Sequence, residues 1–129
     1  MSLPIPLIRQ HAVGYGPANL ITDRDGIVRS GRLAIPFQDR RFPGFAYRIY
    51  EAMSGKKKPQ DNEVSTAPYL INFRGLARSY PVVPYYRILR GEIEPDVFRD
   101  KTVLVGAVAP SLHDLSPTPF SASAPTPGV

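Results

Sequence analysis

The alternation of polar and apolar positions near the start of the chain predicts a β-hairpin. Two β-prone runs, residues 19–22 and 27–30, flank the polar string Asp23-Arg24-Asp25-Gly26. Aspartate side chains bond the local backbone and glycine accepts positive φ, so Asp25-Gly26 is a strong turn signal. An Asp-x-Asp-Gly string also opens calcium loops, but the bidentate carboxylate that such a loop needs further on is missing. The favoured interpretation is a turn, with no metal site.

The next pattern predicts a helix. Apolar residues recur at the i, i+3, i+4 and i+7 spacing of one helical stripe, which consists of Phe42, Phe45, Ala46, Ile49, Tyr50 and Met53. Pro43 suits the first helical position, because its missing N–H costs nothing there, and Gly55 suits the end. We expect this stripe to pack in the core.

Two nearly continuous apolar runs, residues 69–73 and 102–108, predict strands that are covered on both faces. Between them, residues 84–91 begin with proline, place apolar side chains on one face and end with glycine, which predicts a short helix. A strand–helix–strand order with this spacing predicts parallel strands joined by a right-handed crossover. The predicted fold class is α/β, with short parallel strands and crossover helices added to the N-terminal β-hairpin.

The composition limits the size and class of the protein. A chain of 129 residues suits one domain, and its 15 prolines and 10 glycines predict many loops. The chain has no cysteine, and no stretch approaches the roughly 20 apolar residues that span a bilayer. Residues 116–129, rich in proline and serine, predict a loop that lies on the domain.

A formal charge of +5 can attract acidic partners. The basic residues are scattered, however, and the one run, Lys56 to Lys58, lies in a polar loop. Nucleic-acid binding needs a basic face interleaved with aromatic residues that stack on bases. We therefore expect no nucleic-acid partner.

Parallel strands would bring their C-terminal ends to one edge of the sheet, where ligands of open α/β sheets bind. The candidate ligand-binding residues at that edge are Asn72, Arg74, Asp114 and Thr118. Arg74 could hold an anion while Asp114 orients a donor group, or the two side chains could simply pair with each other.

Catalysis has little support in the sequence. Ser111, His113 and Asp114 are the residue types of a triad, but working triads take these groups from separate segments. His11 is the only other histidine and lies far along the chain, so a zinc site is not indicated. We assign no catalytic residue, metal ligand or cofactor, and a small soluble α/β enzyme acting on an anionic substrate stays an alternative.

Several strings, taken in order, resemble the CHASE domain of the second type, an extracellular sensory domain associated with cyclases and histidine kinases. They are Asn19 with Asp23-x-Asp25-Gly26 and Arg29, Pro43 to Ala46, Ile71 to Gly75, Phe98 to Pro110, Asp114-Leu115, Thr118-Pro119 and Pro127 to Val129. One departure is Ser111-Leu112-His113, where the family usually has glycines.

This resemblance implies a sensor outside the cytoplasmic membrane of a bacterium, in a membrane-anchored parent with a nucleotide cyclase or kinase as output. Its ligand would be an unknown small molecule or protein signal. The chain would correspond to the C-terminal portion of the domain. On this basis residues 1–13 are an N-terminal segment whose first residues look like an expression start, 14–115 a partial sensor domain and 116–129 its continuing tail.

A partial domain leaves apolar surface and a strand edge uncovered, so we expect a homodimer. A purely structural dimerisation module of a receptor is a further alternative, since it would need no ligand.

Overall fold

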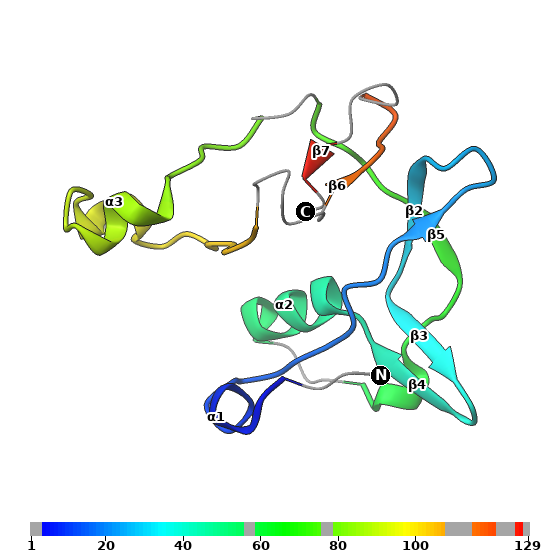
Figure 1. Ribbon diagram of the computed structural model, residues 1–129. Helices are drawn as coiled ribbons and strands as arrows, with labels where there is room; N and C mark the ends of the chain where they lie inside the picture. Colours follow the sequence, from blue (N-terminus) through cyan, green and yellow to red (C-terminus); the bar gives the residue numbers. More distant parts are fainter. Residues whose placement is uncertain (1–3, 56–58, 76–78, 108–114, 121–125, 128–129) are drawn as a thin grey trace. The chain divides into compact units, whose positions relative to one another are not determined.

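The computed structural model describes residues 4–55, 59–75, 79–107, 115–120 and 126–127 (Figure 1). The chain divides into two compact units, Met1–Ile71 and Asn72–Val129. The first begins with a single helical turn, α1 (Pro6–Arg9). Within the described ranges, no helix has the length and apolar character needed to cross a bilayer.

The first unit contains the predicted hairpin. Strands β1 (Ile21–Thr22) and β2 (Val28–Arg32) pair antiparallel, and β5 (Pro68–Leu70) pairs antiparallel with the other edge of β2. The Asp23 N–H donates to the Ile27 carbonyl over 2.9 Å, and Gly26 takes φ of +82° in the turn. The local turn signal therefore predicted this hairpin correctly, because glycine adopts positive φ without a steric penalty.

A second hairpin, β3 (Ala34–Phe37) and β4 (Arg40–Pro43), was not predicted. Its sequence conceals it, because Pro36 lies inside a strand and the turn uses Gln38 at φ of +53° instead of a glycine. Proline is tolerated there since a two-stranded sheet consists only of edge strands.

The predicted helix is confirmed as α2 (Phe45–Ser54), which starts after Gly44 and ends at Gly55 with φ of +59°. Pro43 closes β4 and is not the first residue of the helix. The Phe45 N–H instead donates to the Pro17 carbonyl over 2.9 Å, so the segment before the first hairpin satisfies one donor at the helix start.

The expectation that the apolar stripe of α2 packs in the core is wrong. None of its six residues, Phe42, Phe45, Ala46, Ile49, Tyr50 and Met53, is buried. The one buried residue of α2 is Glu51, 5% exposed. The helix is held through its charged side. Arg48 bonds Glu51 of the same helix and Asp61 of a short 3-10 helix, η1 (Asp61–Glu63).

The core of the first unit is small. Its buried apolar side chains are Val28 of β2, Ala34 of β3 and Val64, which follows η1. The Ala34 N–H donates to the Ser65 carbonyl over 3.1 Å, which ties the second hairpin to the segment between η1 and β5.

The second unit contains α3 (Tyr85–Leu89), the 3-10 helix η2 (Pro95–Phe98) and two short antiparallel strands, β6 (Leu115–Ser116) and β7 (Thr126–Pro127). The predicted short helix is thus confirmed, with Pro84 before it and Gly91 after it at φ of +68°. Among the residues of this unit whose burial is described, none is buried.

The mixed helix and strand class is confirmed, but parallel strands are not shown, since every strand pair in the described ranges is antiparallel. The run 69–73 contributes only its beginning to β5. Residues 102–107 form no strand, and Val105 is 81% exposed; Val108 lies outside the described residues. An apolar run becomes a buried strand only where a neighbour pairs with its backbone and other elements cover both its faces.

Candidate functional site

Three of the four predicted site residues fall in the described part of the second unit. Asn72 and Arg74 are exposed and flank Phe73, while Thr118 is half-buried. The Phe73 and Phe120 rings meet edge to face with 6.4 Å between their centroids. This contact places the 72–74 segment beside the segment that carries Thr118. Asp114 lies outside the described residues.

Arg74 is a cationic group of this region. Its guanidinium carbon lies 5.7 Å from the centroid of the Tyr80 ring. Arg74 forms no salt bridge with any residue that the structure describes. A cation over an exposed ring gains about 0.5–1 kcal/mol, which positions the guanidinium, and no described carboxylate occupies its N–H donors. The alternative, a salt bridge between Arg74 and Asp114, involves a residue outside the described ranges.

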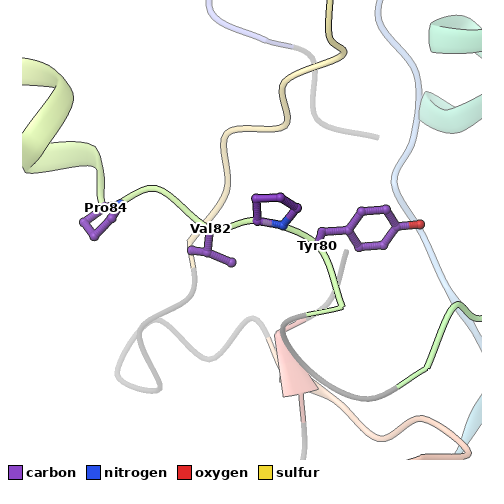
Figure 2. A pocket seen from close by; sticks show the side chains of 4 residues that line it. Tyr80, Val82 and Pro84 are labelled. Atoms are coloured by element: carbon purple, nitrogen blue, oxygen red, sulfur yellow. The ribbon is translucent and has the colours of Figure 1, made fainter. Parts of the chain in front are cut away.

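A shallow groove begins at the same tyrosine. It has a volume of about 430 Å³ and is lined by Tyr80, Pro81, Val82 and Pro84. Figure 2 shows these side chains along one extended segment, with Val82 and the Tyr80 ring pointing in different directions. Small-molecule sites usually measure about 300–1,000 Å³ and combine apolar walls with a few polar groups.

The arrangement offers an apolar wall with a cation at one end. Sequence reasoning found Arg74 but missed the groove, for which the available signal was the string Tyr80-Pro81-Val82-Val83-Pro84. Closely spaced prolines and β-branched residues favour an extended backbone that leaves ring faces open to a ligand.

A separate ionic cluster lies at the β1–β2 turn. Arg29 bridges Asp23, at 2.6 Å, and Asp25, at 2.8 Å. The hydrogen bond from Arg29, followed by one from the Ile27 N–H, lowers the pKa of Asp25 from 3.8 to about 2. Both carboxylates are therefore already bonded to one arginine, which supports a structural turn in place of a cation site.

A second cluster joins α2 to η1. Arg48 donates to Glu51 Oε2 over 2.8 Å and to Asp61 Oδ2 over 2.9 Å. Glu51 Oε1 is buried and has no hydrogen-bond partner among the residues that the structure describes. Burial raises the pKa of the Tyr47 hydroxyl, and the negative charge of Glu51 adds to the effect. No sequence motif pointed to this cluster, because arginine and glutamate three apart on a helix usually form an exposed pair.

The residues considered for catalysis or metal binding are not assembled in the described structure. His11 is exposed, and its Nε2 lies 3.2 Å from Gln10 Nε2. Ser111 and His113 lie outside the described residues. Among the residues that are described, no group of three potential metal ligands occurs.

Comparison with known proteins gives one match. Residues 4–129 match a family model described as the CHASE2 domain. No curated protein and no solved structure matches the chain. The match spans nearly the whole chain and includes both compact units.

Proposed function

Because this chain belongs to the CHASE2 family of extracytoplasmic sensory domains, we propose that it is the input domain of a bacterial membrane-anchored signalling protein. The observation that carries the proposal is the family match over residues 4–129. The proposed output is a nucleotide cyclase or a kinase, the partners that the resemblance implies. Within that protein the domain has a sensory role and no catalytic one.

The proposed ligand is a small molecule with an anionic group and an apolar part. Arg74 is exposed and has no carboxylate partner within the described residues, so it can bind a carboxylate or phosphate. The groove from Tyr80 to Pro84 offers apolar contact beside it. Asn72 and Thr118 border the same region through the Phe73–Phe120 contact and can supply hydrogen bonds.

Sensing requires that the ligand binds one conformation of the domain more tightly than another. The second unit suits this requirement, because none of its residues with a described burial is buried. Few packing contacts therefore have to break when the unit rearranges. A ligand that bridges Arg74 and the Thr118 segment would order both segments and shift the population towards the bound state.

The location of the domain can be tested with alkaline phosphatase fused directly after residue 129 in the parent protein. Phosphatase activity in intact bacteria is expected if the domain is extracytoplasmic. An inactive fusion that is expressed at the same level contradicts the proposal.

The ligand site can be tested with a panel of small anions, comprising inorganic phosphate, citrate, benzoate and phenyl phosphate. An anion of this panel should raise the melting temperature of the wild-type chain and not of Arg74→Ala. Arg87→Ala is the matched control, since Arg87 lies in the same unit but is already paired with Glu92. Equal stabilisation of Arg74→Ala and the wild type would remove Arg74 from the site.

A further inference from the structure

One face of α3 combines exposed apolar and aromatic side chains with a cation at its border. Tyr85, Tyr86 and Leu89 are all exposed. Leu89 lies four residues after Tyr85 and three after Tyr86, so these side chains share one face of the helix. The guanidinium carbon of Arg90 lies 5.4 Å from the centroid of the Tyr86 ring. These four residues form the α3 surface.

The stretch of sequence that carries the α3 surface is basic. It contains no acidic residue between Glu63 and Glu92. In the same stretch it contains four arginines, Arg74, Arg78, Arg87 and Arg90. Their charge nearly equals the formal charge of +5 of the whole chain, so the surface suits an anionic partner.

The nearest carboxylate does not cover the cation of the α3 surface. Glu92 lies 3.2 Å from Nε of Arg87 and 3.8 Å from Nη1 of Arg90. Arg87 therefore holds this carboxylate more closely. The Arg90 side chain stays 70% exposed and can meet a further anion.

We propose that the α3 surface binds the surface of an anionic phospholipid bilayer. Tyrosine is enriched at the boundary between headgroups and acyl chains, where its ring lies in the apolar layer and its hydroxyl stays in water. Leu89 adds an aliphatic side chain that can enter the same layer. Arg90, at the border of the face, is placed to meet lipid phosphate.

The family of the chain favours a bilayer over other polyanions. CHASE2 domains are extracytoplasmic sensory domains. In a membrane-anchored parent, such a domain is tethered beside a phospholipid surface at high effective concentration, so even a weak contact forms. The inference therefore rests on the proposed membrane anchor. It does not involve Arg74 or the groove from Tyr80 to Pro84, so it is independent of the proposed ligand.

Sedimentation of the full chain with lipid vesicles tests the surface. The chain should bind vesicles of phosphatidylcholine and phosphatidylglycerol more tightly than vesicles of phosphatidylcholine alone, and added salt should weaken the binding. Leu89→Asn should lower the partition coefficient at least about tenfold. The matched control is Leu7→Asn, since Leu7 also lies on a short helix and is 67% exposed, against 72% for Leu89.

The role of Arg90 has its own matched pair of variants. Arg90→Gln should lower the partition coefficient about fivefold, the effect of one basic residue at an anionic lipid surface. Arg99→Gln removes the same charge from a side chain that is 71% exposed, and it should change the coefficient less than about twofold. Circular dichroism checks that each variant folds.

A fluorescent label measures directly whether α3 enters the bilayer. The chain has no native cysteine, so Leu89→Cys can be labelled with nitrobenzoxadiazole at that position alone. Phosphatidylglycerol vesicles should shift the emission to the blue and raise its intensity, because the dye leaves water. The same label on Leu7→Cys should show neither change.

Three results would overturn the proposal. The first is a wild-type chain that does not associate with phosphatidylglycerol vesicles. The second is an equal loss of binding in Leu89→Asn and Leu7→Asn. The third is binding to soluble polyglutamate without binding to vesicles, which assigns the α3 surface to an acidic protein. These measurements do not depend on where the parent protein places the domain, whereas the phosphatase fusion tests that location alone.

Discussion

Arg48 donates to Oε2 of Glu51 over 2.8 Å, and this carboxylate is buried while its Oε1 has no hydrogen-bond partner in the described ranges. The arginine also bonds Asp61 of η1. One guanidinium therefore compensates a buried charge and links α2 to the segment that follows it. Removal of one member of such a pair leaves the other charge buried and uncompensated.

Arg48→Leu should lower the free energy of unfolding by about 2 kcal/mol, less than for a fully buried pair because the Arg48 side chain is 25% exposed. Urea denaturation measures the change. Arg99→Leu is the control, since its pair with Asp96 is largely exposed, and a loss below about 0.5 kcal/mol is expected. The double variant Arg48→Leu, Glu51→Leu should recover most of the loss. Equal effects of the two single variants would contradict this role of Arg48.

Gly16→Ala should destabilise the first unit by about 1–3 kcal/mol, because a Cβ at this position would lie 2.4 Å from the Pro43 carbonyl oxygen. The added methyl group pushes Pro17 away and so weakens the hydrogen bond that the Phe45 N–H donates to the Pro17 carbonyl. The matched control is Gly14→Ala, whose Cβ would meet only Arg48 Cδ at 3.8 Å. Thermal melts that shift equally for both variants would show that the close approach at Gly16 is absent.

The Asp25 carboxyl should titrate with a midpoint of about 2, below its ordinary 3.8, because Arg29 bonds its charged form. Since the folded-state pKa is the lower one, the stabilising contribution is present above pH 3.8 and is lost as the pH falls towards 2. Carboxyl chemical shifts followed by NMR measure the midpoint. Arg29→Leu should return it towards 3.8, and an unchanged midpoint in that variant would refute the assigned cause.

The Tyr47 hydroxyl should ionise above its ordinary pKa of 10.0, first because of burial and then because of the nearby charge of Glu51. The raised folded-state pKa means that the contribution to stability is present below pH 10 and is lost as the pH rises through the folded pKa. Tyrosinate absorbance follows this ionisation. Glu51→Gln should move the Tyr47 pKa partway back, and no movement would show that the Glu51 charge is not a cause of the shift.

The sequence alone determined the elements whose signals are local. The Asp25-Gly26 turn set the first hairpin, since its hydrogen bonds and the positive φ of Gly26 involve only neighbouring residues. Apolar spacing and Gly55 set α2, and Pro84 and Gly91 set α3. The ordered strings from Asn19 onwards also identified the family, which the match over residues 4–129 confirms.

Only the tertiary structure decided which face of α2 is covered and what becomes of an apolar run. Periodicity shows that a helix has two faces, but the bonds from Arg48 to Glu51 and Asp61 determine which one turns inward. Residues 102–107 have the composition of a buried strand, yet they form none, because a strand depends on neighbours that are distant in sequence. The candidate site follows the same rule: Arg74 could be named from the sequence, whereas its position over Tyr80 depends on the path of the chain between them.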